Sequence, residues 1–188
     1  MKYKKWNLAA PERSAVEGLR RAGLPALAAL VLCARGLDAP AAAEDFLAAG
    51  EAPLHDPFLL RDMDKAAARL GLALERGESI AVYGDYDVDG ITSTCLLTQF
   101  LRSRGGQVIP YIPDRLEEGY GLNREAVDHL HQAGVSLIVT VDCGITAAAE
   151  TEYANSLGME VIITDHHECK EVLPAAAAVV DPHRDDCA

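Results

Sequence analysis

The sequence predicts an α/β protein with a doubly wound, mainly parallel sheet that is preceded by a small helical segment. Apolar runs recur from Ser79 onward, and stretches with helical spacing separate them. Continuous apolar strands that alternate with helices are typical of a parallel sheet covered on both faces. Residues 1 to about 50 are instead rich in alanine and carry apolar residues at helical spacing. We therefore expect a helical zone followed by an α/β zone.

Short helices are predicted for the first zone. Three alanine-rich stretches each end at a glycine, namely Gly23, Gly36 and Gly50. Glycine is common at helix ends because it adopts left-handed backbone angles without strain. A connector with two prolines at 51–60 is followed by an amphipathic helix at 63–77. We expect residues 1–78 to form a helical segment packed on the core, and residues 79–188 to form the α/β domain.

Strands and helices alternate in the second zone. The predicted strands are 79–84, 107–113, 136–142, 160–165 and 176–181, and the predicted helices are 91–105, 123–134 and 146–158. Parallel strands joined by helices end at the same edge of the sheet, which is where open α/β sheets bind ligands. Residues at the carboxyl ends of these strands are therefore the candidates for a functional site.

The composition excludes several classes of protein. The 188 residues are 49% hydrophobic and 24% charged, which is ordinary for a soluble globular protein. No stretch is long and apolar enough to span a membrane, and no apolar secretory segment follows the basic N-terminus. The five cysteines lie far apart without a CxxC pair, which indicates neither a disulfide framework nor a zinc site. We expect reduced thiols, a cytoplasmic location and no membrane partner.

The net charge of −12 restricts the substrates that the protein can bind unaided. Affinity for nucleic acids rests largely on lysine and arginine side chains that neutralise phosphates. A phosphate-containing substrate would therefore need cations from elsewhere, and bound divalent metals would supply them.

Acidic and histidine side chains follow three of the predicted strands. Asp85, Asp87 and Asp89 follow the first strand, Asp142 closes the third, and Asp165, His166 and His167 follow the apolar part of the fourth. Although far apart in sequence, these residues converge at the carboxyl edge of the predicted sheet. Carboxylate oxygens and neutral imidazole nitrogens are ligands suited to Mn²⁺ or Mg²⁺.

The acidic stretch DYDVDG admits other interpretations than a metal site. An EF-hand loop would need a glutamate where this chain has Leu96, and a helix in front where this chain has a strand. A phosphate-cradling loop would need glycines and a lysine where this chain has carboxylates. A solvated acidic turn that caps the next helix stays open, as does an N-cap role for Asp142. A nucleophilic Cys143 at a helix N-terminus has the least support.

Four sequence motifs carry a resemblance to a known family. In chain order they are VYGDYDVDGITS, YIPDRLEEGYGLN, VTVDCGIT and TDHHE. The chain resembles the DHH phosphoesterase superfamily, and within it the exonucleases specific for single-stranded DNA, to which the N-terminal half is also similar. The resemblance implies a Rossmann-like DHH domain over residues 79–188 and a metal-dependent phosphodiesterase activity.

The same resemblance implies roles for the residues at the strand ends. The implied ligands of two divalent metal ions are Asp87, Asp89, Asp142 and His166, with Asp142 bridging the ions and Asp85 as a further ligand. His167 would act as a catalytic residue facing the scissile phosphate, together with Asp89 and Asp142, and Asp165 would orient the histidines. Where some relatives carry a further histidine ligand, this chain has Tyr83.

The segment after the second strand supplies candidate residues for substrate binding. Arg115 and Arg124 lie on either side of the LEEGYGLN sequence and could hold a phosphate, and Tyr120 could stack on a base. A purely structural role for these three side chains stays open.

The expected function is a metal-dependent 5′-to-3′ exonuclease that acts on single-stranded DNA in repair and recombination. In the family, a fourth motif with another aspartate ligand and a smaller domain follow the TDHH region. We therefore expect this chain to be the N-terminal catalytic part of a longer protein, inactive alone, with DNA bound mainly by the remainder. Two other functions stay open: a phosphoesterase for short oligonucleotides or cyclic dinucleotides, and a binding module without catalysis.

Overall fold

A computed structural model describes residues 8–48 and 55–187, and the chain forms two compact units that divide after His55. The first unit contains the helices α1 (Arg13–Arg21), α2 (Ala26–Ala34) and α3 (Pro40–Leu47). Their core is small and consists mainly of Leu19, Ala29, Leu32, Cys33 and Ala43. The helices predicted for the first zone are therefore confirmed, whereas Gly50 and the start of the predicted connector lie outside the described residues.

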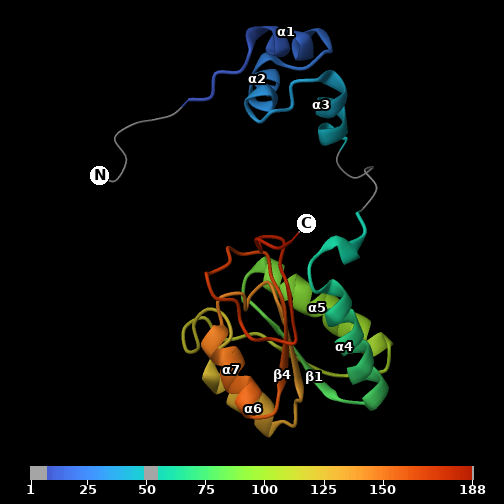
Figure 1. Ribbon diagram of the computed structural model, residues 1–188, viewed down its shortest axis with the longest axis vertical. Coiled ribbons are helices and arrows are strands. Elements are labelled where there is room, and N and C mark those ends of the chain that lie inside the picture. The colour runs from blue at the N-terminus through green and yellow to red at the C-terminus, as the bar shows by residue number, and fades with distance from the viewer. Residues whose placement is uncertain (1–7, 49–54, 188) are drawn as a thin grey trace, which may run out of the picture. The chain divides into compact units, whose positions relative to one another are not determined.

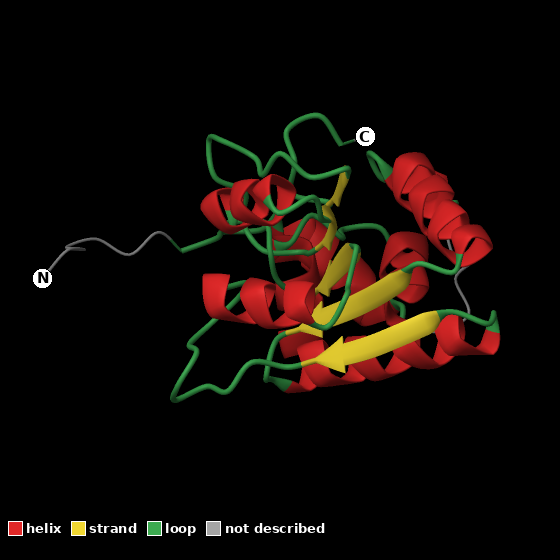
Figure 2. Cartoon of the chain, turned by 90° about the horizontal axis from the view of Figure 1, so that it is seen from below, coloured by secondary structure: helices red, strands yellow, loops and turns green. Residues whose placement is uncertain are grey.

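The second unit is a five-stranded parallel sheet with helices on both faces. Its strands are β1 (Ser79–Gly84), β2 (Gln107–Tyr111), β3 (Leu137–Val141), β4 (Glu160–Thr164) and β5 (Ala178–Val180), in the spatial order β2-β1-β3-β4-β5. Its helices are η1 (Pro57–Leu59), α4 (Met63–Arg76), α5 (Val88–Ser103), α6 (Arg124–Gln132) and α7 (Ala148–Ser156). The doubly wound α/β fold is confirmed, and the strands in Figure 2 all point toward the same edge.

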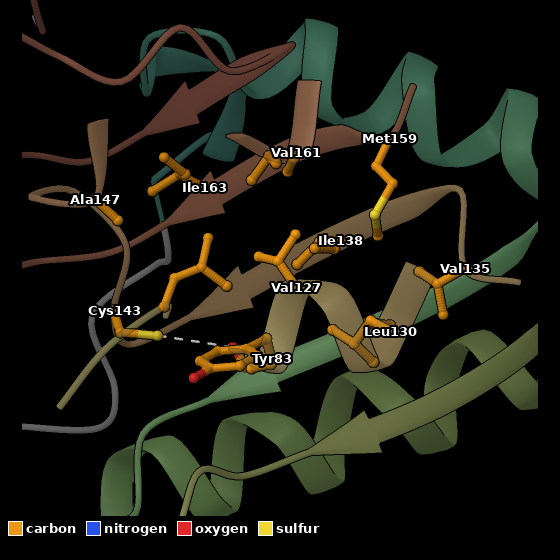
Figure 3. Packing of buried hydrophobic residues seen from close by; sticks show 14 of the residues in the cluster. Tyr83, Val127, Leu130, Val135, Ile138, Cys143, Ala147, Met159, Val161 and Ile163 are labelled. Carbon is orange, nitrogen blue, oxygen red and sulfur yellow. Dashed lines mark hydrogen bonds between the residues drawn. The ribbon is translucent and has the colours of Figure 1, made fainter. Parts of the chain in front are cut away.

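Both faces of the sheet are buried, which explains why the strands are apolar without alternation. Along β1, Ile80 and Val82 belong to the cluster beneath α4 and α5, while Ala81 and Tyr83 belong to the cluster beneath α6 and α7. The two helix pairs lie on opposite sides of the sheet in Figure 1, and Figure 3 shows the second of these clusters. The sheet is therefore covered by helices on both faces, and the loops that follow its strands lie at its carboxyl edge.

Helix α4 belongs to the sheet unit and not to the first three helices. It buries Ala66 and Ala73 in the core and packs mainly against β5. The compact unit therefore starts at Asp56, upstream of the domain start expected at residue 79, because α4 covers part of the sheet. Between β4 and β5 the chain forms a loop with no helix. No helix in the described part of the chain is both long and apolar enough to cross a membrane.

Asp62 ties the start of α4 to the end of β5. Its Oδ1 atom lies 2.6 Å from Lys65 Nζ, and its Oδ2 atom accepts a hydrogen bond from Arg184 Nη1 at 2.8 Å. The Asp62 side chain is only 11% exposed. Burial by itself would raise the pKa of Asp62, but the bonds from Lys65 and Arg184 outweigh burial and lower the pKa to about 2. The carboxylate is therefore stabilising in its ionised form.

Replacement of Asp62 by Asn is expected to lower the free energy of unfolding by about 2 kcal/mol at pH 7. Each unit by which folding lowers the pKa of a carboxylate stabilises the folded state by about 1.4 kcal/mol, and folding lowers the pKa of Asp62 from 3.8 to about 2. Asn tolerates the left-handed backbone of this position, where φ is 62°. The decrease in stability therefore measures the removal of the charge and not backbone strain. Because the folded-state pKa lies below the ordinary 3.8, the stabilisation is complete above about pH 4 and is lost as pH falls toward 2.

Denaturant unfolding of both proteins between pH 7 and pH 3 measures this difference. Asp64→Asn is the matched control, because Asp64 is an exposed carboxylate in the first turn of the same helix. An equal loss in the control, or a loss in Asp62→Asn that does not shrink at low pH, would contradict the assignment.

Candidate metal centre

The first motif places its aspartates at the junction of β1 and α5. Gly90, in the first turn of α5, lies so close to β1 that a Cβ atom there would collide with the backbone of Asp85. Asp87 is the N-cap of α5, and its Oδ1 atom accepts hydrogen bonds from the N–H groups of Asp89 and Gly90 at 2.9 and 3.1 Å. The capping interpretation thus holds for one oxygen of Asp87. These bonds, from Gly90 first, lower the pKa of Asp87.

Asp85 carries a buried polar atom without a hydrogen-bond partner among the described residues. Its side chain points into the protein with only 3% of the residue exposed, and its Oδ1 atom has no hydrogen-bond partner among the described residues. Asp85, Asp87 and Asp142 each offer one oxygen, and these three atoms lie within 4.8 Å of one another. Such a cluster of like charges is unfavourable unless a cation compensates it.

Asp142 joins this acidic cluster to the histidines. Its backbone is left-handed, with φ at 60°, in the turn that leaves β3. Its Oδ1 atom lies 2.8 Å from His166 Nε2, and Asp142, His166 and His167 form a second group of atoms within 4.8 Å of one another. Burial and then the charge of Asp87 raise the pKa of Asp142, which His166 only partly offsets. Among the described residues Asp142 alone belongs to both groups, and its bridging role stays a prediction.

Asp165 forms hydrogen bonds with both residues of the histidine pair, His166 and His167. Its Oδ1 atom lies 2.7 Å from His167 Nδ1 and also accepts the backbone N–H of His166 at 2.8 Å. Its Oδ2 atom accepts the N–H of Ile145 at 2.9 Å, which fixes the carboxylate against the turn after β3. The bond to Asp165 raises the pKa of His167, although burial opposes it. Asp165 thus contacts both histidines, and its orienting role stays a prediction.

The other sequence-predicted residues lie around these groups. Asp89 is exposed in the first turn of α5 and lines a cavity together with Asp142 and His166, but it is outside both groups of close atoms. Arg115 lies over the ring of Tyr86, 5.2 Å from its centroid, and so close to the first motif. Tyr120 is half exposed, and its ring meets that of His167 edge-on at 6.1 Å.

Arg124 occupies a different environment from Arg115. Its guanidinium lies over the ring of Tyr153 on α7, 5.0 Å from the centroid, where it contributes to the contact between α6 and α7. In the described part of the chain no hydrogen bond or ion pair joins it to the acidic groups. Its predicted role in substrate binding stays a prediction that no contact supports.

Sequence reasoning missed Asp181 at the end of β5. This residue is fully buried; its Oδ1 atom accepts the N–H of His183 at 2.7 Å, while Oδ2 has no partner among the described residues. Burial first, and then the charge of Asp165, raise the pKa of Asp181. The signal was present in the sequence, because VVDP repeats the pattern of an aspartate directly after an apolar strand. Tyr86 was also missed, since its contact with Arg115 bridges distant segments.

Cys143 is not a nucleophile. It is fully buried in the turn after β3, and its Sγ atom lies 3.8 Å from the backbone oxygen of Tyr83 (Figure 3). Burial and then the nearby charge of Asp165 raise the pKa of the thiol, so the reactive thiolate is disfavoured. The nucleophile alternative was wrong because sequence does not reveal burial.

The residues of the two groups fit a divalent cation. They offer carboxylate oxygens and imidazole nitrogens, which are the donors that Mn²⁺ and Mg²⁺ accept. The buried Asp85 Oδ1 atom has no hydrogen-bond partner among the described residues, which suits an atom that ligates a cation. The charge of a cation would also offset the repulsion among the carboxylates.

Comparison with curated proteins finds relatives that are named as exonucleases. The chain is 41% identical over 184 residues to the single-stranded-DNA-specific exonuclease RecJ of Bacillus subtilis (strain 168), which covers 97% of this chain and 23% of that protein. It is 48% identical over 129 residues to RecJ of Escherichia coli (strain K12), with 68% of this chain and 22% of that protein covered. The chain therefore spans less than a quarter of the length of these relatives.

Two solved structures of RecJ are similar to this chain in sequence and fold. A crystal structure of exonuclease RecJ bound to manganese matches with a TM-score of 0.65 at 43% identity, over 72% of this chain and 34% of that one. RecJ from Thermus thermophilus in complex with Mn²⁺ matches with a TM-score of 0.69 at 35% identity, over 96% of this chain and 25% of that one.

The family match covers the part of the chain that holds the site. Residues 79–188 match the N-terminal domain of the DHH family. This range contains the whole sheet and every residue of the two groups of close atoms. With fold, site and sequence in agreement over more than half of its length, the chain belongs to the DHH family.

Proposed function

We propose that this chain provides the metal-binding part of a RecJ-type exonuclease that degrades single-stranded DNA from its 5′ end. The observation that carries the proposal is the convergence of Asp85, Asp87, Asp142 and His166 at one edge of the sheet, with Asp142 in both groups of close atoms. Two relatives that are similar in sequence are named as exonucleases, and two related structures hold Mn²⁺. The 5′-to-3′ direction comes from the family resemblance alone.

Two divalent ions, Mn²⁺ or Mg²⁺, are the proposed cofactors. Asp85 and Asp87 would hold one side of the centre, His166 the other, and Asp142 would be shared, while Asp89 would complete the centre from α5. A divalent ion supplies Lewis acidity at the phosphate and offsets the charge of the substrate. An acidic protein with a net charge of −12 needs such compensation in order to approach DNA.

His167 and Asp165 act together in the proposal. Asp165 holds the Nδ1 atom of His167 at 2.7 Å, so Nε2 is the atom left to contact a phosphate oxygen of the scissile bond. Asp165 is itself fixed by the N–H of Ile145, so the ring is oriented before substrate binds. The protein thus positions the phosphate with a preset histidine.

Substrate contacts beyond the phosphate are proposed for Arg115 and Tyr120. Arg115 is exposed and lies over Tyr86, next to the first motif, where it can pair with a backbone phosphate. Tyr120 is 52% exposed beside His167, where it can stack on an unpaired base. Single-stranded DNA is therefore the proposed partner, and a role in DNA repair and recombination in the cytoplasm is proposed with it.

Mn²⁺ is expected to bind the 188-residue chain and to raise its melting temperature, because a ligand that binds only the folded state stabilises it by mass action. At a concentration about 100 times the Kd the gain is about 2.7 kcal/mol. Titration calorimetry and thermal unfolding with and without Mn²⁺ measure the effect. Absence of binding at millimolar Mn²⁺ would rule out the proposed centre in this chain.

Asp142→Asn is expected to abolish most of this stabilisation, since Asp142 belongs to both groups of ligand atoms. Asn tolerates the left-handed backbone, and the loss of one buried charge relieves repulsion, so the metal-free variant keeps at least the stability of the parent. Glu152→Gln, an exposed charge-matched change on α7, should leave Mn²⁺ binding unchanged. Equal losses in the two variants would mean that Mn²⁺ binds the acidic surface without a defined site.

Mn²⁺-dependent release of mononucleotides from 5′-labelled single-stranded DNA is the activity test. Because this chain spans less than a quarter of its relatives, the assay compares it with a polypeptide extended to their length. We expect little digestion by the 188 residues alone, strong digestion by the longer polypeptide, and loss of at least ~10³-fold in rate with Asp142→Asn.

The same assay separates the alternatives. Hydrolysis of dinucleotides or cyclic dinucleotides without digestion of long strands would favour a small-substrate phosphoesterase. Binding of Mn²⁺ and DNA by both polypeptides without any hydrolysis would favour a binding module. Robust digestion by the 188 residues alone would show that the catalytic unit is smaller than expected.

A further inference from the structure

Tyr83 does not take part in the metal centre, although it stands where some relatives of the family carry a ligand. The residue is fully buried in β1, on the face covered by α6 and α7 (Figure 3). Its hydroxyl donates a hydrogen bond to the backbone oxygen of Gly121 at 2.8 Å and accepts one from Asn123 Nδ2 at 3.3 Å. Both partners belong to the segment between β2 and α6, so a core tyrosine is bonded to a loop at the site.

This segment, residues 114–123, is called the substrate loop below. A second tyrosine holds its other half: Tyr111, at the end of β2, stacks on Tyr83 with ring centroids 5.2 Å apart and donates to Glu118 Oε2 at 2.8 Å. Asn123 also donates to Glu118 Oε2, at 3.3 Å. Tyr83, Tyr111, Glu118 and Asn123 therefore form one connected polar network beneath the loop.

The conformation of the loop depends on Gly121. Its φ angle is 78°, a left-handed value that other residues adopt only with strain. Its carbonyl oxygen is the acceptor for Tyr83, and the next residue, Leu122, is 5% exposed and inserts into the core. The loop is thus turned at Gly121 and fastened to the core on both sides of that turn.

Tyr120 immediately precedes this fastening point. Its ring lies edge-on to the rings of His167 and Tyr86, at 6.1 and 6.4 Å between centroids, and its hydroxyl is 3.5 Å from His167 Nδ1. At the other end of the loop, Arg115 is placed over Tyr86. The hydrogen bond to the Gly121 carbonyl therefore holds the chain one residue away from Tyr120, whose ring lies beside His167.

We propose that Tyr83 is a positioning residue whose buried hydroxyl latches the substrate loop, so that Tyr120 stands beside His167 before single-stranded DNA binds. The inference rests on the proposed function for the identity of the ligand. Packing alone does not require the hydroxyl, because a phenylalanine would fill the same apolar space. The hydroxyl instead forms hydrogen bonds with two polar groups of the loop. A loop that is already ordered before DNA binds loses less conformational entropy on binding, so the affinity for DNA is higher.

Tyr83→Phe tests the latch, since it removes the hydroxyl and keeps the ring that stacks on Tyr111. Hydrogen exchange of the 188-residue chain, followed by mass spectrometry, should show exchange in residues 114–123 that is ~5-fold faster or more, with the strands unchanged. Asn123→Ser should act in the same direction, because serine retains the α6 cap made by Asn123 and loses the amide donor.

Tyr153→Phe is the matched control. It also removes a tyrosine hydroxyl with a side-chain partner, the bond to Asp128 at 2.6 Å between α6 and α7, but it has no contact with the substrate loop among the described residues. This variant should leave exchange in residues 114–123 unchanged. Faster loop exchange in the control, or unchanged loop exchange in Tyr83→Phe, would overturn the latch.

The functional consequence is a change in DNA affinity without a change in metal affinity. In the polypeptide extended to the length of the relatives, with Mn²⁺ present, the Kd for a 5′-phosphorylated, phosphorothioate-protected dT octamer should rise about 3- to 10-fold in Tyr83→Phe, which is the effect expected from one neutral hydrogen bond. The Kd for Mn²⁺ alone should match that of the parent. A merely structural role would lower the melting temperature and leave the Kd for DNA unchanged, which would overturn the proposal.

Failure of this inference is distinguishable from failure of the proposed function. A parent polypeptide extended to the length of the relatives that binds Mn²⁺ but no octamer would contradict the proposed substrate class. The exchange experiment uses no DNA, so it would still decide whether Tyr83 latches the loop. A parent that binds the octamer, with no difference in Tyr83→Phe, would overturn the positioning role alone.

Discussion

The site depends on the gathering of like charges at the carboxyl edge of a parallel sheet. Asp85, Asp87 and Asp142 offer oxygens within 4.8 Å of one another, and burial raises the pKa of Asp142 further. A fold can hold such a group because all parallel strands end at one edge and because backbone N–H groups satisfy single oxygens, as they do for Asp87. A cation would give Asp85 Oδ1 the partner that it lacks among the described residues.

The rest of the structure keeps these charges in place. The sheet is covered on both faces, and α4 is fastened to β5 through Asp62 and Arg184, so the strand ends cannot move apart without breaking the core. Asp165 links the turn after β3 to the histidines after β4. Rigidity at these points would let the proposed ligands from three separate segments share one centre without an ordering cost at each binding event.

The polar network beneath the substrate loop extends the same principle beyond the metal centre. Tyr83 reaches from the buried face of β1 to Gly121, and Tyr111 reaches from β2 to Glu118. Burial by itself would raise the pKa of Glu118, but hydrogen bonds from the Asp114 N–H, Tyr111 and Asn123 outweigh it and lower the pKa, so an ionised carboxylate lies at the centre of the network. The core thereby sets the position of a loop that carries Arg115 and Tyr120.

The sequence by itself determined the fold class, the order of the acidic motifs and the edge at which they meet, because apolar periodicity and chain order are local properties. Tertiary structure alone decided which partners those residues find. It placed α4 with the sheet, gave Arg115 and Arg124 different aromatic partners, buried Cys143, and revealed Asp181 and the bonds of Tyr83. These contacts join residues that are far apart in the chain, such as Tyr83 and Gly121, and spacing along a sequence does not record which side chains a packed core brings together.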